Sequence, residues 1–544
     1  MTGELPLKHD AQPTGASITP RDLMTRVYII ADDSMLGRRA GAVGGAKATA
    51  YIADEVRRMG LEPAGDSGTF FQNIPLTRRG VDGASGLSVD AVPLVLWSEF
   101  IPLPEFDGSA FGGVVKFDAA TAIYGGRLGE PDKLITSSQA EGKLVVLAAR
   151  MGPDGRPAAP IGDEANQRYG RAAAVAFVTL DVTGPQTLLY LRQGSTGMST
   201  GAPPRSGAGS FIISNAAAAK LMGASLEGMR PGTTGRIVRA DMKHGEGPTA
   251  APARNVVAIL RGSDPAVRNQ YVAIGAHSDH VGTRAFPLEH DSLKAFNRVL
   301  RQQGAEEPAR PGTPDDLARI RSMIDSMRVK RAPRMDSVFN GADDDASGTS
   351  GVLEVAQALS ALRPAPKRSI LFVWHTAEEL GLFGSEYFTD HPTVPRDSIV
   401  AQLNIDMIGR GSAADSPEGG PGYVQVLGPR RLSSELAALV ESVNTNGRHL
   451  LKLDYQFDAD GHPLQFYCRS DHERYARYGI PIAFFSTGSH PDYHMLTDEA
   501  QYIDYNRLAQ VSGYVRDLAA TIANLDHRLV VDKPKPDPKA ACRQ

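Results

Sequence analysis

The sequence has few cysteines, little net charge and no long apolar run. Its 544 residues include two cysteines, Cys468 and Cys542, too few for a disulfide framework or a four-cysteine zinc site. Lysine and arginine number 58 and aspartate and glutamate 62, so a formal charge of −4 supplies no basic field for a nucleic-acid partner. No apolar stretch approaches the ~20 residues that cross a bilayer, so no membrane span is predicted.

The first residues lack the basic region and the apolar stretch of a secretory signal. From the residues alone, the protein is therefore either cytoplasmic or exported with a signal that this sequence does not include. The apolar content of 42% is that of a globular chain, and the length allows two to four structural units.

The pattern of apolar runs predicts an α/β fold. Thr19 and Pro20 are typical of a helix start. Residues 92–251 contain short β-like runs between Gly- and Pro-rich turns, which indicates a separate β-rich unit. After residue 252 strand and helix alternate, which predicts a mostly parallel or mixed central sheet flanked by helices. The expected strands are 255–260, 271–276, 369–374, 399–405 and 480–486, and the expected helices lie near 346–362 and 431–446.

Two stretches depart from this alternation. Residues 284–338 contain two amphipathic patterns, one near 291–303 and one that begins at Thr313 and Pro314, which predict a helical insertion. This insertion could serve as a lid over the site, or it could form a structural or oligomer contact. Residues 526–544 are rich in proline and charge, and we expect them to be disordered.

Acidic and imidazole side chains follow four of the expected strands, and an acidic run precedes a helix. In an open α/β sheet the carboxyl ends of the strands meet at one edge, so these groups can converge in space. Crowded carboxylates repel one another unless a cation neutralises them. Carboxylates and imidazoles without thiolates suit Zn²⁺, with Mn²⁺ or Co²⁺ as substitutes, and their number suits two ions that share a bridging carboxylate. The side chains are His277, Asp279, Asp343, Asp344, Asp345, Glu378, Glu379, Asp406 and His494.

These side chains follow one another along the chain in the same order as in the co-catalytic zinc aminopeptidases of the bacterial leucyl aminopeptidase type, which the sequence therefore resembles. Glutamate carboxypeptidase and glutaminyl cyclase are more distant relatives of the same kind. The resemblance covers residues 19–90 and 252–525, and implies a zinc-exopeptidase type of fold. The segment 92–251 resembles the protease-associated domain that interrupts such peptidases, chiefly in residues 169–177. The resulting domain prediction is 19–91 and 252–525 for the peptidase, with 92–251 and 284–338 inserted.

The resemblance implies a role for each residue of the set. Asp344 would bridge two Zn²⁺ ions, with His277 and Asp406 on one ion and Glu379 and His494 on the other. Glu378 would be the general base. Asp279 would orient the ring of His277. Tyr467 and Tyr493 are both candidates for stabilising the oxyanion, and His280 receives no role.

The activity expected from this set is hydrolysis of peptides at a free N-terminus. A carboxypeptidase or dipeptidase on the same scaffold is an alternative, since Arg284, Arg410 and Arg469 could bind a terminal carboxylate. A glutaminyl-cyclase-like acyltransferase is a second alternative, but it would use one zinc ion. A non-catalytic binding protein on the same fold would lack ligands that are present here. The resemblance also implies a periplasmic or extracellular location, and the sequence gives no information on the oligomeric state.

Overall fold

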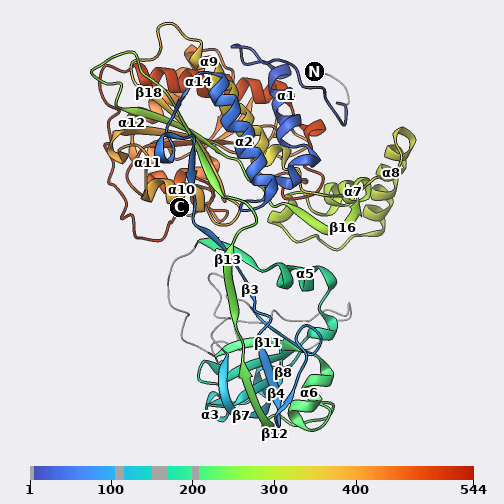
Figure 1. The fold of residues 1–544 in the computed structure, drawn as a ribbon. Helices are drawn as coiled ribbons and strands as arrows, with labels where there is room; N and C mark the ends of the chain where they lie inside the picture. The colour runs from blue at the N-terminus through green and yellow to red at the C-terminus, as the bar shows by residue number, and fades with distance from the viewer. Residues whose placement is uncertain (1–4, 104–114, 150–167, 199–207) are drawn as a thin grey trace. The chain divides into compact units, whose positions relative to one another are not determined.

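The computed structural model describes residues 5–103, 115–149, 168–198 and 208–544, which form two compact units (Figure 1). Unit 1 comprises Met1–Pro75 and Thr249–Gln544, and unit 2 comprises Leu76–Pro248. The boundary expected at residue 92 lies inside unit 2, because β3 (Leu76–Val81) and β4 (Gly86–Val89) pair with later strands of that unit. Among the helices described, none has the length and apolar character that a bilayer crossing requires.

Unit 1 contains a mixed nine-stranded sheet in the order β1-β14-β18-β15-β19-β22-β20-β21, with β2 also paired to β14. Its four central strands, β18, β15, β19 and β22, are parallel, and the neighbouring β14 and β20 run antiparallel to them. The predicted α/β fold with a largely parallel sheet is thus confirmed. The strands are β1 (Glu62–Pro63), β2 (Phe71–Asn73), β14 (Arg254–Leu260), β15 (Tyr271–His277), β18 (Ser369–His375), β19 (Ile399–Ile405), β20 (Tyr423–Leu427), β21 (Lys452–Asp454) and β22 (Ile482–Ser486).

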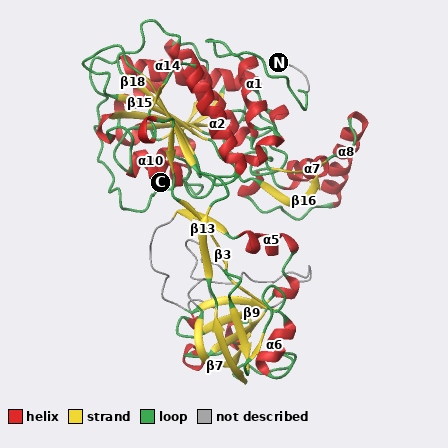
Figure 2. Ribbon diagram, viewed as in Figure 1, coloured by secondary structure: helices red, strands yellow, loops and turns green. Residues whose placement is uncertain are grey.

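Helices surround this sheet (Figure 2). The first begins as its sequence predicts, because the hydroxyl of Thr19 accepts a hydrogen bond from the amide of Asp22 at 3.1 Å and Pro20 occupies the first turn. The long C-terminal helix buries an apolar stripe against neighbouring helices and the sheet. The helices are α1 (Pro20–Ile30), α2 (Val43–Arg58), α9 (Gly348–Ser360), α10 (Phe383–Asp390), α11 (Pro429–Leu432), α12 (Ser434–Asn446), α13 (His472–Ala476) and α14 (Tyr505–Asn524).

Unit 2 is built mainly from strands, as expected for this segment. An eight-stranded sheet has the order β5-β4-β12-β7-β8-β9-β11-β6, and a three-stranded sheet has the order β10-β3-β13. Its identity as a protease-associated domain stays a prediction. The remaining elements are β5 (Val92–Pro93), β6 (Phe100–Pro102), β7 (Lys116–Arg127), α3 (Ser137–Ala140), β8 (Leu144–Ala148), β9 (Ala174–Val178), α5 (Pro185–Gln193), β10 (Ser195–Met198), β11 (Gly209–Ile213), α6 (Asn215–Met222), β12 (Thr234–Asp241) and β13 (His244–Pro248).

The segment 284–338 of unit 1 contains both expected helices, α7 (His290–Leu300) and α8 (Pro314–Lys330). They pack against each other through a small apolar cluster of their own. The sequence pattern did not reveal two strands, β16 (Thr283–Glu289) and β17 (Met335–Val338), which pair with each other in antiparallel orientation. This pairing brings the start and the end of the segment together.

The C-terminal tail, expected to be disordered, has no regular helix or strand but is tied to unit 1. Cys468 and Cys542 form a disulfide across 74 residues. The side chain of Gln544 accepts a hydrogen bond from the amide of Tyr467 at 3.0 Å. A composition rich in proline and charge does not reveal such covalent and local anchors, which is why the expectation differs from the structure.

Arg38 joins the N-terminal turn to the loops that carry the site. Its side chain is buried, and its guanidinium donates to the carbonyl oxygens of Ser278 at 3.2 Å, Asn340 at 2.5 Å and Gly341 at 2.9 Å. A further contact of 3.3 Å reaches the carbonyl of Asp344. A buried carbonyl that loses its donor costs free energy, so this one side chain stabilises several loops together.

Replacing Arg38 by Met should therefore lower the free energy of unfolding by about 3 kcal/mol or more, because several buried carbonyls lose their donor. Urea unfolding followed by intrinsic fluorescence measures the change. The matched control, Arg39→Met at the adjacent and more exposed position, should change it by about 0.5 kcal/mol or less. Equal losses in the two variants would contradict the role given to Arg38.

Candidate metal centre

The parallel strands bring the predicted ligands to one edge of the sheet. His277 is the last residue of β15, Glu379 lies in the loop after β18, and Asp406 directly follows β19. The loop after β22 carries His494, and Asp344 lies in the turn before α9. Residues far apart in the sequence thus meet because the carboxyl ends of parallel strands lie side by side.

The carboxylate of Asp344 lies between two groups of side chains. Its Oδ1 is 3.0 Å from His277 Nε2, which is also 3.5 Å from Asp406 Oδ1. Its Oδ2 is 2.8 Å from His494 Nε2, which in turn is 3.0 Å from Glu379 Oε2. All five residues to which the sequence gave a ligand role are therefore brought together, with one oxygen of Asp344 facing each group.

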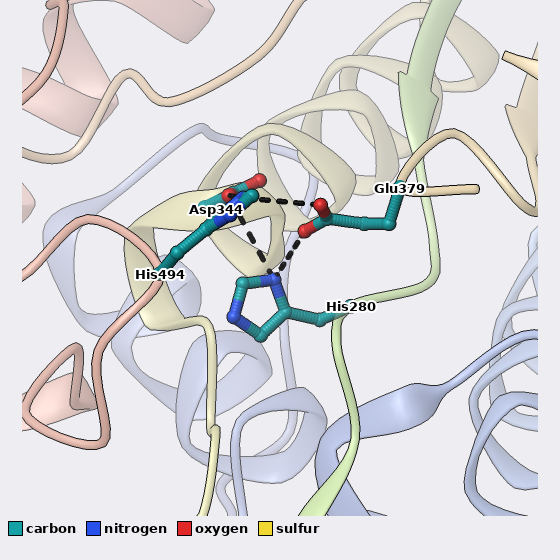
Figure 3. Close-up of side chains that lie close together, drawn as sticks. All are labelled: His280, Asp344, Glu379 and His494. Carbon is teal, nitrogen blue, oxygen red and sulfur yellow. Dashed lines mark hydrogen bonds and ion pairs between the residues drawn. The ribbon is translucent and has the colours of Figure 1, made fainter. Parts of the chain in front are cut away.

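His280 belongs to the second group, although sequence reasoning gave it no role (Figure 3). Its Nδ1 lies 2.6 Å from Glu379 Oε1 and 3.7 Å from Asp344 Oδ2. The signal that could have identified it is its place in the same strand-end loop as His277 and Asp279. The sequence pattern predicts either a surface position or a supporting position beside the ligands for this histidine, and the structure shows that its side chain is buried.

The two other aspartates of the acidic run bind the chain itself. Asp345 accepts hydrogen bonds from the amides of His277 at 3.2 Å, Gly348 at 2.8 Å and Met407 at 3.1 Å. Asp343 accepts from the amide of Gly409 at 2.6 Å. Although Asp345 lies within ligand distance of His277 and Asp406, its oxygens are taken by these amides, so it serves to position the neighbouring loops.

Asp279 connects the first group to Glu378. Its Oδ1 accepts the amide hydrogen of Glu378 at 3.1 Å and lies 3.8 Å from His277 Nδ1. His277 Nδ1 is closer to the carbonyl oxygen of Asp279, at 3.2 Å. Burial raises the pKa of the Glu378 carboxyl well above its usual range, and the nearby Asp406 adds to the effect.

The two candidate tyrosines differ in their surroundings. Tyr493 stacks on the ring of His494 with centroids 4.1 Å apart, and it lines the same pocket as Asp406. Tyr467 packs instead under the guanidinium of Arg431, 4.3 Å from the ring centroid, and against His472. The geometry thus brings Tyr493 to the cluster of ligands and gives Tyr467 contacts outside it.

The donor set fits divalent metal ions. Ligand atoms that all lie within 4.8 Å of one another form one group at His280, Asp344, Glu379 and His494, and a second at His277, Asp345 and Asp406. Bonds of ~2.0–2.2 Å from Zn²⁺ to nitrogen and oxygen suit such spacings. Burial by itself lowers the pKa of His494. The carboxylates of Glu379 and Asp344 have a larger opposite effect and raise this pKa to about 11. This marks a strongly negative environment that stabilises positive charge.

Comparison with known proteins gives partial but consistent matches. The chain is 32% identical over 170 residues to leupeptin-inactivating enzyme 1 of Streptomyces exfoliatus, which covers 31% of this chain and 34% of that protein. It is 30% identical over 153 residues to leucine aminopeptidase 2 of Arthroderma otae, which covers 27% and 28% of the two chains. These matches therefore span about a third or less of the curated relatives.

Among solved structures, a zinc aminopeptidase from Bacillus subtilis aligns with a TM-score of 0.48 at 17% identity, over 93% of this chain and 95% of that one. An aminopeptidase from Aneurinibacillus sp. aligns with a TM-score of 0.47 at 17% identity, over 95% and 97%. The model of peptidase family M28 matches residues 255–519, which include every ligand described above. This match assigns residues 255–519, just under half of the chain, to peptidase family M28.

Proposed function

We propose that the protein is a di-zinc aminopeptidase that hydrolyses peptide bonds at a free N-terminus. The observation that carries the proposal is the carboxylate of Asp344, which faces His277 with one oxygen and His494 with the other. A carboxylate in this position suits a bridge between two ions. The name of one relative, leucine aminopeptidase 2, supports the same function.

His277, Asp344 and Asp406 would hold one Zn²⁺ ion, and Asp344, Glu379 and His494 the other. The chemistry that such ions supply when bound is activation of a water and polarisation of the scissile carbonyl. Glu378 accepts the proton of the attacking water and delivers it to the leaving amine. Tyr493, stacked on His494, donates its hydroxyl hydrogen to the developing oxyanion. Asp279 fixes the backbone of Glu378.

The partners of the arginines favour the amino end of a substrate over the carboxyl end. Arg410 donates to Asp492 at 3.0 Å and to Asp415 at 2.6 Å, and Arg469 donates to Glu306 at 2.7 Å. Arg284 donates to the carbonyl of Phe286 at 2.6 Å and is half-buried. A carboxypeptidase needs a cation that is free to bind the terminal carboxylate, and each of these side chains already has a partner.

The disulfide between Cys468 and Cys542 supports an oxidising location for the mature protein, as in the periplasm or outside the cell. A cytoplasmic protein would rarely keep such a bond. The substrates would then be peptides in that compartment.

Peptides blocked at one end test the direction of cleavage. A peptide with both ends free and its C-amidated form should be hydrolysed at similar rates, whereas the N-acetylated form should resist, because the ammonium group is lost. Liquid chromatography with mass spectrometry identifies the released residue. Cleavage of the N-acetylated form with resistance of the C-amidated form would instead show a carboxypeptidase.

Replacing Glu378 by Gln should lower kcat by about 10³-fold, since the variant keeps the side-chain shape but cannot accept a proton. Metal content, measured by elemental analysis, should stay as in the wild type. The matched control is Glu386→Gln in α10, whose carboxylate lies 3.3 Å from Arg474; its kcat should stay within about twofold. A fully active Glu378→Gln enzyme would refute the assignment of the base.

Metal removal provides an independent test of the centre. Chelation should abolish hydrolysis, and titration with Zn²⁺ should restore it at two ions per chain. His494→Ala should reduce the bound zinc to about one ion per chain, because one of the two groups loses its imidazole. A wild-type content of one ion would favour the cyclase alternative.

A further inference from the structure

A pocket opens beside the proposed metal ligand Asp406. Its wall combines the apolar side chains of Met407, Phe466 and Phe484 with Tyr493 and the guanidinium-bearing Arg469. The serine next to Arg469 donates its hydroxyl hydrogen to Asp406 Oδ2 at 2.7 Å, so the pocket wall is continuous with the metal centre.

Arg469 does not present a free charge to this pocket. Its guanidinium forms a two-pronged ion pair with Glu306, in which Nη1 donates to Oε2 at 2.7 Å and Nη2 donates to Oε1. The guanidinium also lies 5.2 Å from the ring centroid of Phe466. Two parallel hydrogen bonds fix the direction of an arginine as well as offsetting its charge. The charge of this wall is therefore set by a residue that lies outside the pocket lining.

Glu306 comes from the inserted segment 284–338, and backbone contacts hold it in place. The amide of Ala305 donates to the carbonyl of Tyr493 at 3.0 Å. Gly304 has φ +57, and a Cβ there would lie 2.5 Å from the same carbonyl oxygen, so only glycine permits this close approach. The turn that carries Glu306 thus rests directly on the loop of Tyr493 and His494.

Side chains fasten the rest of the insertion to the same loop. Lys294 donates to Asp492 at 2.8 Å, and His290 Nε2 lies 3.1 Å from Glu499 Oε2. Glu499 is also paired with Arg334, and Arg334 lies 3.9 Å from Asp336. Because this arginine already compensates the two carboxylates, the group formed by His290, Asp336 and Glu499 acts as an attachment point of the insertion.

We infer that Glu306 is a specificity-determining residue: by neutralising Arg469 it adapts the pocket to an uncharged side chain at the cleaved end of the substrate. This inference rests on the proposed aminopeptidase function. Without the Glu306 carboxylate, Arg469 presents a positive charge beside an apolar wall, and an acidic side chain gains a charge-assisted partner. The inserted segment therefore takes part in substrate selection through one carboxylate.

The test measures kcat/KM of zinc-loaded enzyme on glutamyl and leucyl reporter substrates. In Glu306→Gln, the ratio of the glutamyl to the leucyl value should rise by about tenfold, the factor expected for one hydrogen bond to a charged group. In the double variant Glu306→Gln/Arg469→Gln, the ratio should fall back to within about twofold of the wild type. An unchanged ratio in the single variant, or a raised ratio in the double variant, would overturn the inference.

Two control variants separate charge from structure. Glu306→Asp keeps the negative charge and should keep the wild-type ratio. Glu307→Gln removes the neighbouring carboxylate, which accepts from the amide of Gln303 at 3.0 Å, and should also keep it. A raised ratio in either control would show that a disturbed turn, rather than the lost charge, changes selection, and would refute the role of Glu306.

Binding supplies a readout that does not need turnover. Calorimetric titration with L-glutamate and L-leucine should show a gain of about tenfold for glutamate relative to leucine in Glu306→Gln. A wild-type protein that does not cleave leucyl reporters would contradict the proposed function, while this titration would still decide on the inference. An unchanged relative affinity in Glu306→Gln would overturn it.

Discussion

The whole site depends on several carboxylates that lie close together in a buried part of the protein, where little water reaches them. Asp344, Glu379 and Asp406 lie within reach of one another at the edge of the sheet, together with three imidazoles. Like charges in such a setting repel strongly, so the arrangement demands compensation by positive charge. A divalent cation meets that demand better than protons do, since it also fixes the directions of its ligands. The stability of the loops and the chemistry of the site therefore rest on the same electrostatic constraint.

The three consecutive aspartates of the acidic run have different roles: one faces the imidazoles, and the other two bind the backbone. In the acidic run, Asp344 faces the imidazoles while Asp345 binds three backbone amides and Asp343 binds a fourth. Asp498 holds the run from the other side, because its carboxylate accepts the amides of Asp343 and Asp344. Hydrogen bonds from backbone amides hold Asp343 and Asp345 in place. The carboxylate of Asp344, which lies between them in the sequence, therefore keeps a fixed orientation toward the imidazoles.

Much of this could be predicted from the sequence because two of its signals are local and strong. Buried apolar runs that end in His277 and Asp406 predict both the parallel strands and the edge where their ends meet, and Thr19 with Pro20 predicts the start of α1. Features that arise only from long-range packing were missed. The place of His280, the disulfide of Cys542 and the pairing of Glu306 with Arg469 depend on which loops become neighbours, and periodicity carries no information on that.

The bonds of Arg38 have a consequence for the order in which the protein assembles. This side chain and the carbonyl of Asp344 are 306 positions apart, and His494 is synthesised later still. Contacts between residues so far apart in the sequence form late in folding, because closing a large loop costs conformational entropy before the contact stabilises the chain. A nascent chain therefore cannot complete the proposed metal centre before His494 has been made, and capture of a metal there would be coupled to folding.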